Sequence, residues 1–224
     1  MKNNSFIKVN EFIDSTLLRT DSTKQEISKL CEEAKKFSFK SVCVNPIFVK
    51  FAKKKLNKTN VKVCTVISFP LGASTKKTKI FETINAIENG ADEIDMVANI
   101  SCIKDHDYEY VEDEIKEILK IVKKENKILK VIIETCLLTK EEIIEVSLIC
   151  KKIKVDFVKT STGFSKKGAT VEDVALIKKV IGNKIGVKAS GGIRTYDEAI
   201  AMINAGASRI GTSKGVDIIK GCKK

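Results

Sequence analysis

Short apolar runs alternate with helix-like segments along the whole chain, and this alternation limits the folds open to it. Continuous apolar runs of this length are typical of parallel strands that are covered on both faces. Residues 12–17 can supply one more strand, preceded by a short extra helix. Eight βα units in 224 residues predict an α/β fold, the (β/α)8 TIM barrel, as a single domain over residues 1–224. The other seven predicted strands are residues 42–45, 61–68, 93–98, 129–134, 155–160, 185–190 and 209–212.

The segments between these runs carry helix signals. Gly90 and Gly206 follow two helical segments in the similar sequences NGADEI and AGASRI, where glycine suits a left-handed cap. An open, doubly wound sheet is the alternative architecture, but no GxGxxG motif follows the first strand. Four threonines have an acidic residue three positions later, which is the pattern of a capping box: Thr23, Thr139, Thr170 and Thr195.

Composition narrows the possible functions. His106 is the only histidine, which disfavours a His-rich zinc site and a Ser-His-Asp triad. Seven cysteines without a CxxC pair predict reduced thiols in a cytoplasmic protein. No uncharged apolar run approaches the ~20 residues of a membrane span, and the N-terminal residues lack the features of a secretory signal. We therefore expect a cytoplasmic location and no membrane partner.

The net charge of +12 comes mainly from lysines in short clusters, such as residues 53–55 and 178–179. Lysines near helix ends are normally solvated and are favoured by the helix dipole. A nucleic-acid surface would concentrate arginine and aromatic residues, whereas this chain is 6% aromatic and has no Trp. We expect no nucleic-acid partner, and we expect the positive charge to attract a small phosphorylated substrate.

Four charged residues interrupt the apolar strands: Asp95, Lys130, Lys159 and Lys188. A charge inside a central strand is costly to desolvate unless it is partnered, so we expect these four to form one compensating cluster. In a barrel the active site lies at the carboxyl ends of the strands. A structural ion-pair network is the alternative, but three lysines on successive strands beside a carboxylate favour a functional cluster.

A lysine cluster has a specific chemical use. Attack on a carbonyl needs a neutral amine, whereas free lysine has a pKa of about 10.4. A second ammonium about 4 Å away disfavours the charged form by around 4 kcal/mol at an effective dielectric of about 20. Lys159 and Lys188 lie on strands that we expect to be adjacent, so one can be the nucleophile and the other its pKa depressor. The residues alone do not say which.

Glycine-rich turns follow the last three predicted strands, at residues 160–163, 190–192 and 211–215. Backbone N–H groups in such turns, with a helix N-terminus behind them, can bind an anion. Tight turns that merely need glycine are the alternative. Because three adjacent turns share the pattern, the sequence predicts a phosphate site. A nucleoside triphosphate is not expected, since there is no Walker motif.

Eight segments lie in order along almost the whole chain: FIDSTLL (12–18), VCVNP (42–46), TVISFPLG (65–72), GADEIDMV (90–97), LKVIIET (129–135), DFVKTSTGF (156–164), VKASGGIR (187–194) and RIGTSKG (209–215). Together they resemble the deoxyribose-phosphate aldolase family. The pair VKTSTGF and VKASGGIR is highly specific, because few barrels have this arrangement of lysines. The resemblance implies a lyase that cleaves 2-deoxy-D-ribose 5-phosphate reversibly to acetaldehyde and D-glyceraldehyde 3-phosphate through a lysine Schiff base.

The resemblance also implies roles for single residues. Lys159 matches the Schiff-base lysine, Lys188 the second lysine that tunes it, and Asp95 the acid/base carboxylate. Lys130 matches the charge partner of that carboxylate. Phe164 departs from the pattern, because some members have Lys there, and the chain ends without the C-terminal Tyr of certain relatives. The other substrate-binding residues that the resemblance implies are Asp14, Thr16, Cys43, Thr162, Gly163, Gly191, Gly192 and Ser213.

The expected enzyme needs neither a metal nor a cofactor, because the lysine imine itself accepts the electrons. Its expected partner is a small-molecule sugar phosphate, and a homo-oligomer, first of all a dimer, is possible. One alternative is a Schiff-base aldolase for another sugar phosphate. An alternative of a different class is a non-catalytic basic barrel that binds phosphorylated ligands or nucleic acid.

Overall fold

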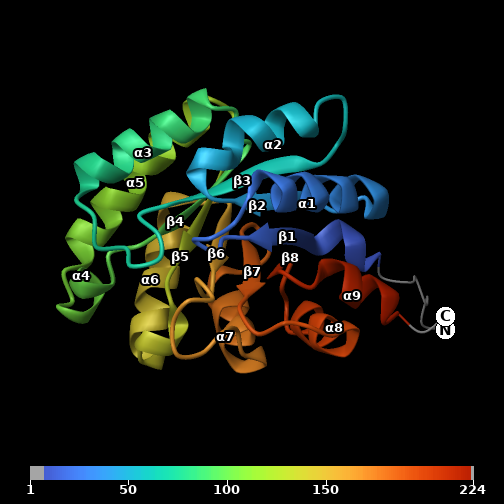
Figure 1. The fold of residues 1–224 in the computed structure, drawn as a ribbon. Helices are drawn as coiled ribbons and strands as arrows, with labels where there is room; N and C mark the ends of the chain where they lie inside the picture. Colours follow the sequence, from blue (N-terminus) through green and yellow to red (C-terminus); the bar gives the residue numbers. More distant parts are fainter. Residues whose placement is uncertain (1–7, 223–224) are drawn as a thin grey trace.

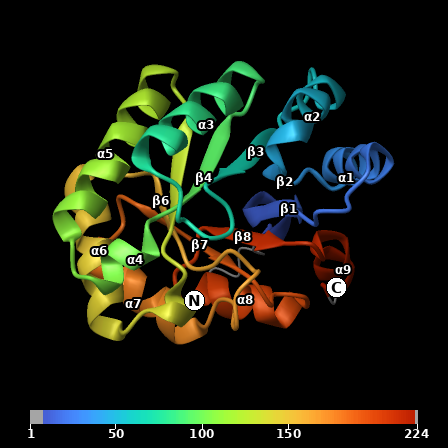
Figure 2. The same cartoon turned by 60° about the vertical axis from the view of Figure 1, so that its left-hand side comes forward.

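The computed structural model describes residues 8–222. Residues 1–7, which begin the segment considered as a secretory signal, and the lysines at 223 and 224 lie outside this range. Eight parallel strands form a closed barrel in chain order, with β1 paired to β8, and Figures 1 and 2 show the helices around it. The strands are β1 (Ile13–Leu17), β2 (Ser41–Val44), β3 (Lys62–Ile67), β4 (Glu93–Val97), β5 (Ile128–Ile132), β6 (Phe157–Lys159), β7 (Gly186–Ser190) and β8 (Arg209–Thr212).

The predicted (β/α)8 barrel is therefore confirmed, and each predicted strand matches an observed one to within two residues at either end. The short extra helix before the first strand is the 3-10 helix η1 (Val9–Phe12), and two further 3-10 turns are η2 (Pro46–Phe48) and η3 (Thr135–Leu137). The α-helices are α1 (Lys24–Phe37), α2 (Val49–Lys55), α3 (Lys76–Glu88), α4 (Ile100–Lys104), α5 (Tyr108–Lys124), α6 (Lys140–Ile153), α7 (Val171–Ile181), α8 (Tyr196–Asn204) and α9 (Gly215–Lys220).

The helix starts follow the capping signals. Thr23, Thr139 and Thr195 each form a complete capping box, in which the threonine and the glutamate three positions later satisfy each other's backbone N–H. Thr170 accepts a hydrogen bond from the backbone N–H of Asp173, and no reciprocal bond is observed. These caps fix where the chain enters α1, α6, α8 and α7 after each loop at the carboxyl end of the barrel.

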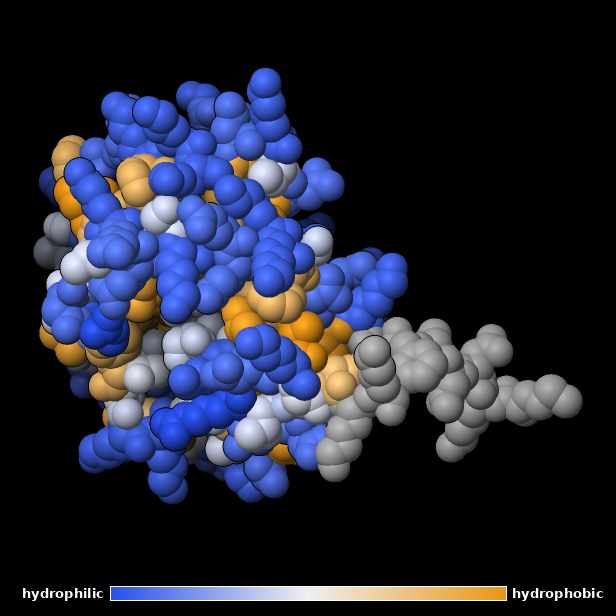
Figure 3. All heavy atoms as spheres, turned by 45° about the vertical axis from the view of Figure 1, so that its right-hand side comes forward, coloured by the Kyte–Doolittle hydropathy of each residue, from blue (hydrophilic) through white to orange (hydrophobic). Residues whose placement is uncertain are grey.

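Most of the apolar core lies between the strands and the surrounding helices, while the barrel interior holds much less apolar material. A separate small cluster of Leu18, Cys43, Cys64 and Val66, with Phe69 packed against it, is buried apart from the main core. Figure 3 shows a face that is mostly hydrophilic, with apolar side chains in a few small groups. No helix within residues 8–222 is long and apolar enough to cross a membrane.

Strand register brings the interrupting charges to neighbouring positions. Asp95 on β4 is the register partner of Lys130 on β5, and Lys159 on β6 is the partner of Lys188 on β7. Side chains alternate between the two faces of a strand, so a shift of one residue in any strand would turn its charge away from the barrel interior. The site therefore depends on the register of four consecutive strands.

Candidate active site

The Asp95 carboxylate is the centre of the charged cluster inside the barrel. Lys130 Nζ donates to Asp95 Oδ1 at 2.8 Å. Two further ammonium groups share the other oxygen, because Lys159 Nζ lies 2.8 Å and Lys188 Nζ 2.7 Å from Oδ2. All four side chains are at most 3% exposed. The structure thus brings together the four residues that interrupt the predicted strands.

A second group of charges lies beside this centre. Lys188 Nζ is 2.6 Å from Asp14 Oδ2, and Arg209 Nη1 donates to Asp14 Oδ1 at 2.6 Å. Arg209 also donates to Glu93 Oε2 at 2.9 Å, and Lys130 Nζ is 2.6 Å from the same Glu93 oxygen. Four cations therefore face three carboxylates. The sequence argument missed Glu93 and Arg209, although each begins a strand within one of the similar segments NGADEI and AGASRI.

The cluster keeps its two central groups charged at neutral pH. Burial alone would raise the pKa of the Asp95 carboxyl, but Lys130, Lys159 and Lys188 outweigh burial and hold that pKa well below its usual range. Burial disfavours the Lys188 ammonium, yet the carboxylates of Asp14 and Asp95 hold its pKa above the ordinary value. Lys188 is thus a fixed positive charge that shares Asp95 Oδ2 with Lys159.

Two cysteines lie next to the cluster. Cys43 and Cys64 are register partners on β2 and β3, both fully buried, and Cys64 Sγ is 3.1 Å from Asp95 Oδ1. Their sulfur atoms and an Asp95 oxygen lie within 4.8 Å of one another, which is a geometry that could hold a metal ion. Three ammonium groups already contact that carboxylate, so a cation there would be opposed by their charge.

A cavity of about 460 Å³ opens above the cluster at the carboxyl ends of the strands. We call it the carboxyl-end cavity. Of the charged cluster, only Lys159 lines it. Asp14, Cys43, Asp95, Lys130 and Lys188 are fully buried and do not line it. The remaining predicted site residues all line it: Thr16, Thr162, Gly163, Gly191, Gly192 and Ser213.

The glycines of this cavity have backbone conformations that favour glycine. Gly163, Gly191 and Gly192 have φ of 86°, 85° and 82°. A Cβ on Gly191 would lie 2.8 Å from the Gly168 Cα, so this turn also needs glycine for close packing. A Cβ on Gly192 would meet nothing within 4 Å. A side chain at Gly192 would therefore extend into open space beside the cavity.

Glu134 supports the loop that follows Lys159. This residue lies between β5 and η3 and has a left-handed conformation with φ of 49°, which is uncommon for a residue with a side chain. Its carboxylate accepts hydrogen bonds from both the backbone N–H and the hydroxyl of Thr162. The cavity is also lined by Arg19, Arg194 and Lys214, whose charges the sequence argument did not include in the site.

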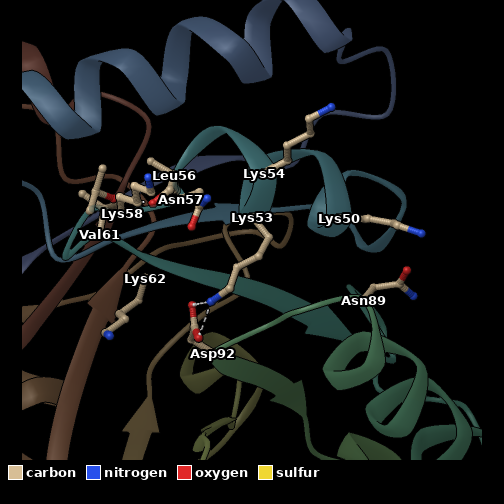
Figure 4. A pocket seen from close by; sticks show the side chains of 11 residues that line it. Lys50, Lys53, Lys54, Leu56, Asn57, Lys58, Val61, Lys62, Asn89 and Asp92 are labelled. Atoms are coloured by element: carbon tan, nitrogen blue, oxygen red, sulfur yellow. Dashed lines mark hydrogen bonds and ion pairs between the residues drawn. The ribbon is translucent and has the colours of Figure 1, made fainter.

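Another hollow, also of about 460 Å³ and lined by several lysines, lies at the amino end of the barrel (Figure 4). We call it the lysine hollow, after Lys50, Lys53, Lys54, Lys58 and Lys62. Lys53 Nζ contacts both oxygens of Asp92, at 2.7 and 2.8 Å. In Figure 4 Lys50, Lys54 and Lys62 extend in different directions instead of converging. These three lysine side chains therefore do not meet at one point where they could act together on a substrate.

Comparison with known proteins agrees with the fold and with the family resemblance. Residues 9–221 match the model of the DeoC/LacD family aldolases. The chain is 54% identical over 224 residues to deoxyribose-phosphate aldolase of Caldanaerobacter subterraneus, covering 100% of this chain and 97% of that protein. It is 55% identical over 221 residues to deoxyribose-phosphate aldolase of a Geobacillus species, covering 99% and 97%. The tetrameric deoxyribose phosphate aldolase from Aeropyrum pernix superposes with a TM-score of 0.88 at 33% identity, covering 95% of this chain and 89% of that one.

The closed parallel barrel, with a buried lysine cluster below a cavity at its carboxyl end, is the architecture of a TIM-barrel enzyme. The matches make the assignment specific. The chain belongs to the DeoC/LacD aldolase family, and it is a lyase. The resemblance found in the sequence is confirmed.

Proposed function

We propose that this chain cleaves 2-deoxy-D-ribose 5-phosphate reversibly to acetaldehyde and D-glyceraldehyde 3-phosphate through a Schiff base on Lys159. Relatives that match the chain almost from end to end are deoxyribose-phosphate aldolases. We choose Lys159 over Lys188 as the nucleophile because of its access to the carboxyl-end cavity. Lys159 lines the carboxyl-end cavity, whereas Lys188 is buried and contacts two carboxylates.

The proposed reaction begins when neutral Lys159 attacks the C1 aldehyde of the open-chain sugar. Loss of water from the carbinolamine leaves a protonated imine, which accepts the electron pair of the C2–C3 bond as that bond breaks. The C3 hydroxyl loses its proton and becomes the aldehyde of glyceraldehyde 3-phosphate. The enamine left on Lys159 is then protonated at C2 and hydrolysed to acetaldehyde, which restores the amine.

Asp95 is the proposed proton carrier, and Lys188 is the fixed positive charge beside it. Lys188 stays positively charged because Asp14 and Asp95 raise its pKa. That charge disfavours a second ammonium at Lys159 and so favours the nucleophilic amine. Asp95 contacts both lysines through one oxygen, which allows protons to pass between the carbinolamine, imine and enamine stages. Lys130 compensates the charge of Asp95 from the other oxygen.

The substrate phosphate is proposed to bind at the glycine turns. Gly163, Gly191, Gly192 and Ser213 line the same cavity as Lys159, and the backbone N–H groups of such turns suit a dianion. Thr16 and Thr162 line the cavity, while Asp14 and Cys43 lie buried below it, nearer the aldehyde end. No metal or cofactor is needed in this scheme, because the imine is the electron sink.

Imine trapping tests the proposal. The protein is incubated with acetaldehyde and borohydride, and peptide mass spectrometry locates the reduced two-carbon adduct. We expect it on Lys159. An adduct on Lys188 would overturn the assignment, and a different sugar phosphate cleaved far faster would point to another Schiff-base aldolase. A protein that forms no adduct and cleaves no sugar phosphate would be the non-catalytic barrel.

We further propose that residues 1–224 form one domain, that the protein is cytoplasmic, and that it assembles as a homodimer. The continuous order of strands around one barrel supports the first, and seven cysteines without a CxxC pair support the second. Ile47, Leu71 and Phe81 are at least 70% exposed, and large apolar side chains of this kind are often covered by a partner. A mass measurement in solution distinguishes a dimer from the tetramer named for the Aeropyrum pernix enzyme.

A further inference from the structure

Apart from the charged cluster inside the barrel, a fully buried ion pair lies outside the barrel interior. Lys79 on α3 and Glu114 on α5 are both 0% exposed, and Lys79 Nζ is 2.9 Å from Glu114 Oε1. The two helices lie side by side on the outside of the barrel (Figures 1 and 2). Apolar side chains could fill this space at lower desolvation cost, because a buried ion pair is rarely worth more than good packing. The proposed reaction uses neither residue.

The remaining contacts of this pair show what it holds. Lys79 Nζ donates to the backbone carbonyl of Val97 at 2.9 Å, and Glu114 Oε2 accepts from the backbone N–H of Asn99 at 3.2 Å. Val97 is the last residue of β4, and Asn99 is the N-cap of α4. Both backbone groups therefore belong to the segment by which the chain leaves the strand that carries Asp95.

The same segment, residues 97–99, is also closely packed against the loop that follows β3. A Cβ on Gly72, in the loop after β3, would lie 2.2 Å from the Ala98 carbonyl oxygen and 2.9 Å from Val97 Cγ1. The N–H of Ala98 donates to the carbonyl of Ile132 on β5 at 3.0 Å. Residues 97–99 are thus held by a loop on one side and by the buried pair on the other.

We propose that Lys79 and Glu114 are positioning residues that hold the end of β4 so that Asp95 meets Lys159 and Lys188. Asp95 lies two residues before Val97, and its contacts of 2.7 and 2.8 Å leave little room for displacement. A misplacement of about 1 Å in a catalytic group can cost around 10²-fold in rate. This inference rests on the proposed role of Asp95 in the reaction.

The test replaces both members of the pair at once. Lys79→Met/Glu114→Met keeps similar side-chain volume and leaves no unpaired buried charge, but it cannot bind the Val97 carbonyl or the Asn99 N–H. We expect kcat to fall about tenfold or more, while KM for 2-deoxyribose 5-phosphate stays within about twofold. The glycine turns that we propose to bind the phosphate follow β6, β7 and β8, whereas the buried pair contacts the segment after β4.

A matched control exists on the same two helices. Lys76 on α3 and Asp113 on α5 also form an ion pair, but it is partly exposed, with the two side chains 32% and 50% exposed. Lys76→Met/Asp113→Leu removes this surface link, and we expect kcat and KM close to those of the unchanged protein. Imine trapping at Lys159 should persist in both double variants. In the buried-pair variant the pH midpoint of trapping should shift, because Asp95 no longer lies in its place beside Lys159 and Lys188.

The inference is wrong if the buried-pair variant folds and keeps its kcat and its trapping midpoint. Asp95→Asn is measured in parallel to separate the two proposals. If Asp95→Asn remains fully active, the role of Asp95 has failed, whereas an inactive Asp95→Asn beside an active buried-pair variant rejects the positioning role alone. Should the buried-pair variant not fold, Gly72→Ala presses on Ala98 with the pair intact. A normal kcat in that variant would also reject the inference.

Discussion

Each end of this barrel has a hollow of about 460 Å³ that lysine side chains help to line, and the difference between the two shows what makes a lysine chemically useful. At the amino end, the lysines of the lysine hollow are exposed and extend in different directions, with Lys53 paired to Asp92. At the carboxyl end, Lys159 lies against a buried carboxylate that two further lysines also contact.

Solvent is the physical reason for the difference. Water screens charges that lie at the surface, so neighbouring surface lysines change one another's pKa little. Inside the barrel the same charges interact at a lower effective dielectric and have no room to separate. The positive charge that counts in this enzyme is therefore that of the buried lysines and Arg209, even though most of the lysines lie on the surface.

The largest effect should come from removing the proposed nucleophile. Lys159→Met keeps the length of the side chain but has no amine, so no imine can form at any pH. We expect the cleavage rate to fall at least about 10⁴-fold and the borohydride adduct to disappear. Loss of activity with a persistent adduct at another lysine would show that the nucleophile had been misassigned. A steady-state cleavage assay and peptide mass spectrometry make the measurement.

The second effect concerns the fixed charge beside that nucleophile. Lys188→Met removes the positive charge that Asp14 and Asp95 maintain beside Lys159. Without that neighbouring charge, the neutral amine needed for attack is less favoured. Trapping should be about 10²-fold slower at neutral pH and should partly recover at alkaline pH.

The recovery at alkaline pH separates this variant from Lys159→Met, which should not recover. The recovery is expected because a higher pH favours the neutral form of any amine. A Lys188→Met variant whose trapping rate is equally low at every pH would mean that Lys188 acts in another way, for example only as a proton donor.

A smaller and more selective effect is expected at the glycine turns that we propose to bind the substrate phosphate. Gly192→Leu places a side chain in the space beside the carboxyl-end cavity, where it should obstruct the backbone N–H groups. We expect KM for 2-deoxyribose 5-phosphate to rise about tenfold or more, with little change for unphosphorylated deoxyribose.

Gly182→Leu is the matched control for this variant. Gly182 also has a positive φ, of 74°, and its Cβ would also meet nothing within 4 Å, but it lies away from the carboxyl-end cavity. Both variants strain the backbone, so stability should fall in both. Only Gly192→Leu should discriminate between the two sugars, and equal losses on both would mean that the turn is merely structural.

The smallest effect belongs to the lysine hollow. Lys54→Ala removes an exposed charge from a group that does not converge, so kcat and KM should stay within about 1.5-fold and the free energy of unfolding within about 0.5 kcal/mol. A Lys54→Ala variant that loses activity would contradict the comparison between the two ends of the barrel.

The sequence by itself determined the architecture and most of the cavity. Continuous apolar runs and threonine caps are local signals, so they predict β1 to β8 and the starts of α1, α6, α7 and α8 without knowledge of long-range contacts. Charges within apolar strands also identified Asp95, Lys130, Lys159 and Lys188, because an uncompensated charge there would be too costly.

Only the tertiary structure decided how those charges are partnered. Arg209 and Asp14 are 195 positions apart, and they meet because β8 closes the barrel against β1. Lys79 and Glu114 appear as ordinary helix residues in the sequence, since nothing local shows that their helices bury them against the end of β4. Access to the cavity, which distinguishes Lys159 from Lys188, likewise follows from the depth of each side chain in the closed barrel. How deeply a side chain is buried and which charges it contacts depend on strand register and packing, which no single strand specifies alone.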